Sequence, residues 1–176
     1  SCAFDLIDAK IVRDIQPGEI VFFNKDIELT TKAILERQNK RVYHCMYEYI
    51  YIARPDSILD GKSVYKVREN AGIHLARMDE NEPEIDKQNA IVIPIPDSGK
   101  AAATGYSLHS KLPYYEGLMK NRFIFKTFLR PNQSVGLNLI KMKLNPIGHI
   151  VKDKEIILID DSIIRETSIS FHITAL

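Results

Sequence analysis

This sequence has few cysteines and almost no surplus charge of either sign. Only Cys2 and Cys45 occur among its 176 residues, and no stretch resembles a secretory signal. A disulfide framework is therefore excluded, and a reducing cytoplasm is the expected compartment. With 24 basic and 23 acidic residues the net charge is +1, so no overall field attracts nucleic acid or an anionic membrane. Any phosphate group must be held by local contacts.

Long apolar runs are missing as well. The longest, at residues 90–95 and 156–159, fall far short of the ~20 residues that a membrane-spanning helix requires. We therefore expect a soluble protein that spans no membrane. The sequence begins without methionine and stops at Leu176, within a pattern typical of an amphipathic helix. Since domains usually end in exposed flexible segments, we expect a fragment of a longer protein.

Short strand patterns and one clear helix pattern fill the first half of the sequence. Residues 9–14 and 19–23 flank a Pro-Gly turn and predict a small antiparallel pair. Residues 45–52 are rich in aromatic and β-branched side chains, which indicates a strand. A helix is predicted from Ser63 onward, because apolar residues recur there at helical spacing: Val64, Val67, Ala71, Leu75 and Met78.

The second half alternates strand and helix patterns. Residues 90–96 are continuously apolar, which predicts a strand covered on both faces, and an alanine-rich helix follows from about Lys100. Residues 114–119 and 155–159 are further strand candidates. This alternation predicts an α/β fold with an open parallel sheet. In such sheets ligands bind beyond the carboxyl ends of the strands.

Two adjacent carboxylates follow the predicted strand at residues 155–159. Asp160 and Asp161 offer hard oxygen ligands, which suit Mg²⁺ or the hydroxyl groups of a ribose. The next residues, 162–168, are rich in hydroxyl groups and precede a predicted helix, so they could surround a phosphate with N–H and O–H donors. Two acids at a strand end also fit a solvated or capping turn.

A second polar turn follows the predicted strand at residues 90–96. Ser98 could reach a metal ion or a phosphate, and Gly99 would let the backbone approach a ligand closely. The same Asp97-Ser98-Gly99 sequence is also common at ordinary helix starts. Two such turns in one parallel sheet suggest a ligand that carries two phosphate groups.

Cations alternate with aromatic side chains at residues 120–133. The cations are Lys120, Arg122, Lys126 and Arg130. Three interpretations fit this composition: a solvated basic loop, a surface for single-stranded nucleic acid, and a lid that closes over a polyanion and excludes water. Composition does not separate them.

Five motifs occur in the order found in one enzyme family. They are Glu-Tyr-Ile-Tyr-Ile-Ala-Arg-Pro-Asp-Ser at 48–57, Ile-Pro-Ile-Pro-Asp-Ser-Gly at 93–99, Lys-Asn-Arg at 120–122, Lys-Leu-Asn at 143–145 and Ile-Leu-Ile-Asp-Asp-Ser-Ile-Ile-Arg at 157–165. Nearly the whole sequence resembles the glutamine phosphoribosylpyrophosphate amidotransferases. The resemblance implies that residues 1–44 are the end of an N-terminal-nucleophile glutaminase domain with a connector. Residues 45–176 would form a type I phosphoribosyltransferase fold that is incomplete at its carboxyl end.

The resemblance also implies a reaction and its partners. The parent enzyme would make 5-phosphoribosylamine from phosphoribosylpyrophosphate and ammonia taken from glutamine, at the first step of purine biosynthesis. It would be a cytoplasmic homo-oligomer that needs Mg²⁺ and binds neither nucleic acid nor membrane. Cys45 matches a ligand of the [4Fe-4S] cluster that one branch of the family carries, with the other ligands outside this sequence.

Site residues are carried over position by position. Those matching the flexible catalytic loop are Lys120, Arg122 and Lys126. Those matching substrate-binding positions are Asp97, Ser98, Gly99, Lys143, Asp160, Asp161, Ser162, Arg165, Thr167 and Ser168. Magnesium ligands would be Ser98, Asp160 and Asp161.

Three positions depart from the family pattern. Cys2 is not the counterpart of the N-terminal nucleophile, so this chain should not hydrolyse glutamine. Glu166 replaces a glycine of the phosphate loop and places a carboxylate near a bound phosphate. Phe125-Lys126 replaces Gly-Arg, exchanging a hinge for bulk and a forked donor for a point charge. Two alternatives therefore stand beside the enzyme interpretation: a non-catalytic module that binds phosphoribosylpyrophosphate, and an inactive truncated product.

Overall fold

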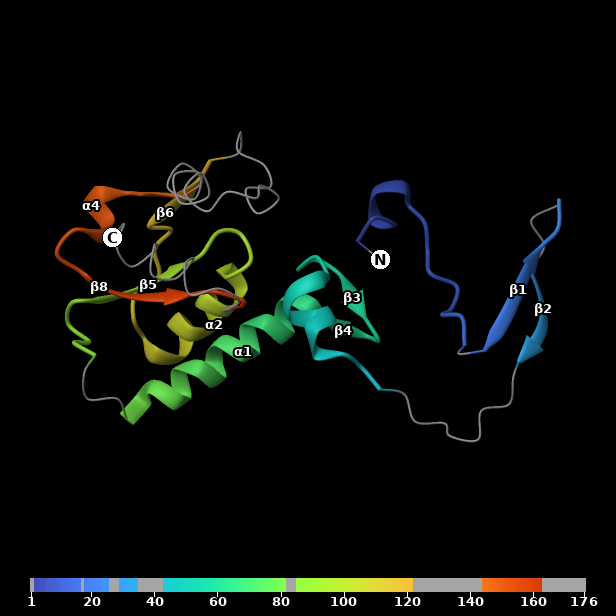
Figure 1. Ribbon diagram of the computed structural model, residues 1–176, viewed down its shortest axis with the longest axis horizontal. Coiled ribbons are helices and arrows are strands. Elements are labelled where there is room, and N and C mark those ends of the chain that lie inside the picture. Colours follow the sequence, from blue (N-terminus) through green and yellow to red (C-terminus); the bar gives the residue numbers. More distant parts are fainter. Residues whose placement is uncertain are drawn as a thin grey trace, which may run out of the picture. The chain divides into compact units, whose positions relative to one another are not determined.

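The computed structural model describes residues 2–16, 18–25, 29–34, 43–81, 85–121 and 144–162. The chain divides into two units, Ser1–Met46 and Tyr47–Leu176, and Figure 1 gives the order of their elements. Within the described residues, no helix combines the length and the apolarity that crossing a bilayer requires.

The described residues of the first unit include an antiparallel strand pair. Strand β1 (Glu19–Phe23) pairs with β2 (Leu29–Ile34), after a short 3₁₀ turn η1 (Asp5–Ile7). The prediction of a strand at residues 19–23 is confirmed, but the predicted partner at residues 9–14 is wrong, since that segment has no regular structure. Its contact with β1 is made by a side chain instead, because the Arg13 guanidinium donates to the Glu19 carboxylate at 2.8 Å.

The second unit is built on a small parallel sheet. Strand β5 (Ala90–Pro94) pairs in parallel with β8 (Glu155–Ile159) along its whole length, and Tyr114 forms a parallel bridge to Val92 on the other side of β5. The predicted α/β class with a parallel sheet is confirmed. Two strands that come between β5 and β8 in the sequence, β6 (Leu118–Lys120) and β7 (Leu144–Pro146), pair with each other in an antiparallel arrangement.

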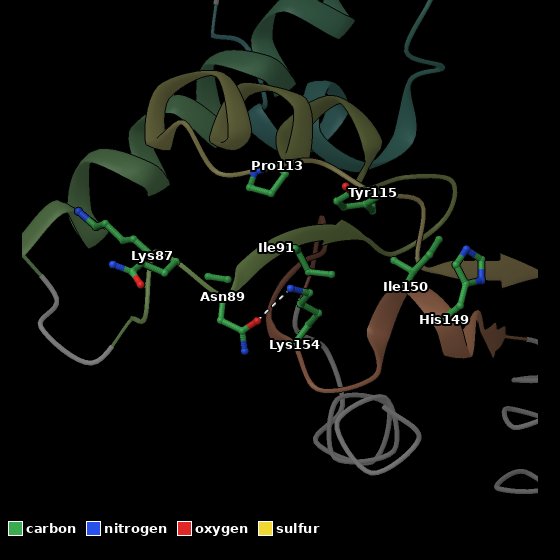
Figure 2. Close-up of a pocket in the computed structure, with 10 residues that line it drawn as sticks. Lys87, Asn89, Ile91, Pro113, Tyr115, His149, Ile150 and Lys154 are labelled. Carbon is green, nitrogen blue, oxygen red and sulfur yellow. Dashed lines mark hydrogen bonds between the residues drawn. The ribbon is translucent and has the colours of Figure 1, made fainter.

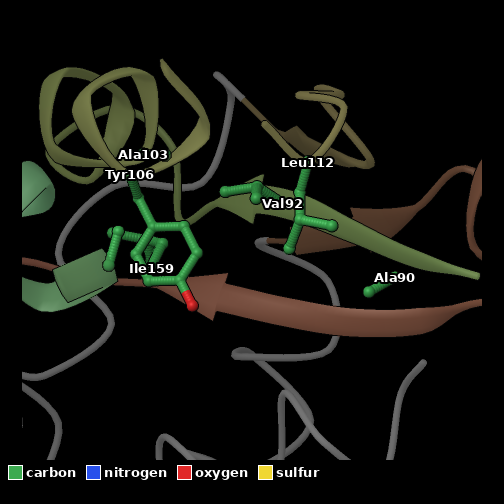
Figure 3. Close-up of a cluster of buried hydrophobic side chains, with 7 residues drawn as sticks. Ala90, Val92, Ala103, Tyr106, Leu112 and Ile159 are labelled. Atoms are coloured by element: carbon green, nitrogen blue, oxygen red, sulfur yellow. The ribbon is translucent and has the colours of Figure 1, made fainter. Parts of the chain in front are cut away.

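Strand β5 is covered on both faces, as its continuous apolar sequence predicts. Ala90 and Val92 of this strand join a cluster with side chains from helices α1 (Val64–Met78) and α2 (Lys100–Ser110), shown in Figure 3. The odd-numbered residues of β5 join a second cluster with Leu118, Leu144 and Val151, from β6, β7 and the short helix α4 (Gly148–Val151). The strand that ends at the first polar turn is therefore the centre of the core.

Helices α1 and α2 pack with their backbones in close approach. A Cβ atom at Gly72 of α1 would overlap the carbonyl oxygen of Ala102, and one at Gly105 of α2 would overlap that of Glu69. Each glycine therefore removes the side chain that would hold the other helix away. Ser63 caps the start of α1, since its Oγ accepts from the N–H of Lys66 at 3.3 Å.

The predicted helix is confirmed at residues 64–78, but the apolar stripe that predicts it differs in part from the face that is buried. The fully buried residues of α1 are Val64, Arg68, Gly72 and Ala76, whereas Leu75 and Met78 are exposed. Small side chains at positions 72 and 76 admit α2, so close packing rather than hydrophobicity selects this face.

The predicted strand at residues 45–52 is also wrong, because this segment is helical. It forms a π-helical turn η2 (Glu48–Ile52). The ring of Tyr47, the residue before this turn, lies 5.2 Å from the ring of Tyr51, and both side chains are exposed. Tyr49 points inward, and its hydroxyl donates to Asp60 at 3.0 Å. Tertiary contacts thus override the β propensity of the aromatic residues. The remaining elements are β3 (Ile58–Leu59), β4 (Lys62–Ser63) and η3 (Asp79–Asn81).

Candidate functional site

The two polar turns predicted from the sequence start side by side. Strands β5 and β8 end at the same level, with Pro94 opposite Ile159. The N–H of Ile95 donates to the carbonyl oxygen of Ile159 at 2.8 Å, which extends the pairing by one residue. The turns at residues 96–99 and 160–162 therefore leave the same edge of the sheet. This is the edge at which open parallel sheets bind ligands.

Gly99 joins the two turns. Its N–H donates to the carbonyl oxygen of Ile95 at 3.0 Å, and helix α2 begins at the next residue. A side chain at position 99 would overlap the carbonyl oxygen of Ile159, so only glycine lets this turn lie against the end of β8. Packing against β8 is therefore enough to require glycine at position 99. The predicted contact between Gly99 and a ligand stays a prediction.

An ion pair lies at the first turn. The ammonium group of Lys120, the last residue of β6, donates to Oδ2 of Asp97 at 2.7 Å. The fold thus brings together two site residues that come from separate sequence motifs. Ser98, between Asp97 and the buried Gly99, is partly exposed. A second exposed pair joins Lys100 to Glu116 at 2.9 Å.

The second turn holds its two carboxylates through short-range hydrogen bonds. The backbone N–H of Asp161 donates to Oδ1 of Asp160 at 2.8 Å, and the hydroxyl of Ser162 donates to Oδ1 of Asp161 at 3.0 Å. All three residues are partly buried. The turn therefore presents two carboxylates and a hydroxyl group within three consecutive residues.

Asp160 is difficult to ionise in this position. The pKa of its carboxyl group is raised to about 6, chiefly by burial and also by the negative charge of Asp161, while the hydrogen bond from the Asp161 N–H acts in the opposite direction. Both raising effects penalise the charged form. A pair of this kind favours either a shared proton or a bound cation.

Arg68 is a part of this region that the sequence did not reveal. It is a buried charged residue of α1, only 4% exposed. Its Nε donates to the carbonyl oxygen of Tyr49 at 2.9 Å, and its Nη2 donates to that of Ala53 at 2.8 Å. Burial lowers the pKa of the guanidinium, and the charge of Asp161 opposes that shift. Its helical phase, four residues before Gly72 and eight before Ala76, is the signal that could have identified it.

The other predicted site residues lie outside the described part of the chain or away from this edge. Outside it are Arg122, Lys126, Lys143, Arg165, Thr167 and Ser168, and also Phe125 and Glu166. Cys45 is exposed, forms no disulfide and belongs to the first unit. Among the described residues, no group of three or more His, Cys, Asp or Glu side chains could hold a metal ion without further ligands.

A separate hollow of about 360 Å³ lies at the amino end of β5. Figure 2 shows that Lys154, one of its polar residues, is hydrogen-bonded to Asn89. None of the predicted site residues within the described segments lines it. The sheet edge at the carboxyl ends of β5 and β8 is therefore the candidate site.

Comparison with known proteins gives the class and then the family. No protein-family model matches the chain. The parallel pairing of β5 and β8 places the chain among α/β proteins with an open parallel sheet, and the acid and hydroxyl groups at the strand ends form the candidate ligand site of that class. The chain is 46% identical over 166 residues to the amidophosphoribosyltransferase of Methanothermobacter thermautotrophicus and 44% identical over 168 residues to that of Archaeoglobus fulgidus. These matches cover 94% and 96% of the chain, and 33% and 35% of the relatives.

A solved structure agrees with these relatives. The glutamine phosphoribosylpyrophosphate amidotransferase of B. subtilis, complexed with ADP and GMP, matches 99% of the chain with a TM-score of 0.79 at 34% identity. The chain covers 36% of that protein. The chain belongs to the amidophosphoribosyltransferase family, and it spans about a third of the length of the relatives it matches.

Proposed function

We propose that this chain supplies the phosphoribosylpyrophosphate-binding edge of an amidophosphoribosyltransferase. In this proposal the full-length protein makes 5-phosphoribosylamine from phosphoribosylpyrophosphate and ammonia taken from glutamine, the first step of purine biosynthesis. The observation that carries it is the junction of Gly99 with Ile159, which holds two polar turns at one sheet edge. The identity of the relatives supports the enzyme over both a non-catalytic binding module and an inactive product.

Mg²⁺ fits the donor groups of this edge. Asp160 and Asp161 offer carboxylate oxygens and Ser98 offers a hydroxyl group, which are the hard ligands this ion prefers. Two neighbouring carboxylates repel each other, and a divalent cation would relieve that repulsion. Because Mg²⁺ usually keeps several water or phosphate ligands, two or three protein oxygens suffice when the substrate supplies the rest.

The remaining side chains would divide between the two phosphorylated ends of the substrate. At the 5′-phosphate we place the loop after β8, with Ser162, Arg165, Thr167 and Ser168. At the pyrophosphate we place the turn at residues 97–99 and the cation Lys143. The loop cations Lys120, Arg122 and Lys126 would stabilise the charge of the leaving pyrophosphate and cover the site.

The reaction needs positioning and charge stabilisation more than proton transfer. The lone pair of ammonia forms a bond to the anomeric carbon of the ribose, while the bond from that carbon to the pyrophosphate oxygen breaks and its electron pair leaves with pyrophosphate. The new amine then loses a proton to solvent. Bound Mg²⁺ would neutralise the leaving group, and the carboxylates at Asp160 and Asp161 would accept hydrogen bonds from the ribose hydroxyls.

The proposal also assigns the two parts of the chain. Residues 45–176 would be an incomplete type I phosphoribosyltransferase domain, and residues 1–44 the end of a glutaminase domain with its connector. In the full-length protein Cys45 would ligate an iron–sulfur cluster if the remaining ligands are present. That protein would be a cytoplasmic homo-oligomer.

Substrate binding tests the assignment of the acid pair. In the full-length protein that carries this chain, calorimetric titration with phosphoribosylpyrophosphate should show Mg²⁺-dependent binding. Asp161→Asn should weaken it at least about tenfold, or ~1.4 kcal/mol. The control is Asp153→Asn, an exposed position at the other end of β8 whose positive φ of 59° suits asparagine. Equal affinity of wild type and Asp161→Asn would contradict the assignment.

A further inference from the structure

The contact between Lys120 and Asp97 connects two segments that are distant in sequence. Their side chains are 38% and 67% exposed. Exposed ion pairs contribute only about 0–1 kcal/mol to stability, so the fold itself does not depend on this contact. Both residues nevertheless lie at the sheet edge where the proposed function puts the pyrophosphate.

A carboxylate is a poor direct ligand for pyrophosphate. Asp97 and the phosphate oxygens carry charge of the same sign, and their approach would be repulsive unless a cation lies between them. The ammonium of Lys120 is such a cation, and it is already bonded to Asp97 at 2.7 Å. Of the three N–H donors of a lysine, that bond uses one, which leaves two for an anion.

We propose that Asp97 is a positioning residue whose carboxylate holds the Lys120 ammonium at the turn, ready to stabilise the leaving pyrophosphate. This inference rests on the proposed function and adds a role to one of its residues. The lysine stem has four rotatable bonds, and fixing its ammonium group in advance removes an entropic cost from the transition state. The carboxylate of Asp97 therefore acts through Lys120, while the pyrophosphate is bound by the rest of the turn and by the cations.

The role predicts an unusual division between kcat and KM. Removing the charge of Asp97 releases Lys120, so the negative charge that grows on pyrophosphate in the transition state is less well stabilised and kcat falls. Removing the same charge also relieves its repulsion of the bound substrate, so KM stays the same or decreases. A purely structural role for Asp97 would not produce this combination.

The experiment is a double-mutant cycle in the full-length protein, with ammonia as nitrogen donor and Mg²⁺ present. The variants are Asp97→Asn, Lys120→Met and the double substitution, and pyrophosphate release is measured against substrate concentration. Asp97→Asn should lower kcat about tenfold without raising KM, and Lys120→Met should lower kcat at least as much. The double variant should resemble Lys120→Met within about twofold, because the effect of Asp97 on the reaction passes through the Lys120 ammonium.

Glu116→Gln is the matched control, since it neutralises a similar exposed carboxylate paired with Lys100 at 2.9 Å. It should keep kcat and KM within about twofold of the wild type. If the fold losses in kcat of the two single variants instead multiply in the double variant, Asp97 acts independently of Lys120. That result would overturn the inference while the proposed function stands. If the wild-type protein releases no pyrophosphate, the proposed function and the inference both fail.

Discussion

Gly99 lies against the carbonyl oxygen of Ile159, and no side chain fits between them. That oxygen also accepts the N–H of Ile95 at 2.8 Å, so it is fixed by the sheet and moves only if the end of the sheet moves. The contact holds together the turn that carries Asp97 and the turn that carries Asp160. The geometry of the candidate site therefore depends on a position without a side chain.

Gly99→Ala should separate the two turns. Its Cβ would overlap the carbonyl oxygen of Ile159, and forcing a methyl group into a closely packed contact costs roughly 1–3 kcal/mol. We expect Mg²⁺-dependent binding of phosphoribosylpyrophosphate by the full-length protein to weaken at least about tenfold. Gly148→Ala is the control, because no atom lies within 4 Å of the Cβ it would add. Equal loss of binding in both variants would show that the contact with Ile159 is not the cause.

Arg68→Met should destabilise the second unit. Methionine keeps much of the side-chain volume, but the carbonyl oxygens of Tyr49 and Ala53 lose donors at 2.9 and 2.8 Å. A buried polar group left without its partner costs about 1–3 kcal/mol. A cost of ~2 kcal/mol would lower the thermal midpoint by roughly 5 °C for a domain of this size.

The matched control for that change is Arg77→Met, which removes the same charge from an exposed position of α1. Its midpoint should remain within about 1 °C of the wild type, because exposed substitutions away from such contacts usually have small effects. Scanning calorimetry of the full-length protein measures both variants. Midpoints lowered equally by the two substitutions would refute a specific role for the Arg68 hydrogen bonds.

Asp160 should make stability depend on pH in a direction opposite to that of most acids. Its pKa in the folded protein is raised to about 6, so the folded state holds this proton more tightly than the unfolded state does. The contribution of Asp160 to stability is therefore favourable at low pH and is lost as the pH rises from about 4 to about 6. The full shift corresponds to roughly 3 kcal/mol, and because Asp160 is only half-buried, screening by solvent should reduce the loss to on the order of 1–2 kcal/mol.

Asp160→Asn isolates this effect, since asparagine does not ionise. The quantity to compare is the midpoint of Asp160→Asn minus that of the wild type. This difference should be a few degrees more positive at pH 7 than at pH 4.5, roughly what 1–2 kcal/mol produces. Asp153→Asn, made at an exposed carboxylate, provides the comparison at both pH values. A difference between wild type and Asp160→Asn that is the same at both pH values would count against burial and the charge of Asp161 as the cause.

The sequence predicted the structure correctly where burial alone decides which residues a strand contains. Strand β5 is apolar throughout because both of its faces are covered, and this feature alone predicts a central strand followed by a polar turn. The end of β8 could be read in the same way. Parallel pairing then follows from the alternation of strands and helices, and it puts Asp97 and Asp160 at one edge.

The errors arose where contacts between distant residues decide the structure. The segment at residues 45–52 has the composition of a strand, yet it is helical, and the carbonyl of Tyr49 in it is bonded by Arg68, nineteen residues later. Likewise the buried side of α1 is set by Gly72, whose lack of a side chain admits Ala102. Neither contact leaves a hydrophobic periodicity near the residues it controls, and the four-residue spacing of Arg68, Gly72 and Ala76 marks the buried side of α1 only by the small size of two of these residues.

The most direct measurement of the central claim is ammonia-dependent release of pyrophosphate from phosphoribosylpyrophosphate by the full-length protein, with Mg²⁺. The account predicts release that requires the metal, that falls at least about a hundredfold in the double variant Asp160→Asn/Asp161→Asn, and that is unaffected by Asp153→Asn. Substrate binding without any release by the wild-type protein, or release that persists in the double variant, would contradict it.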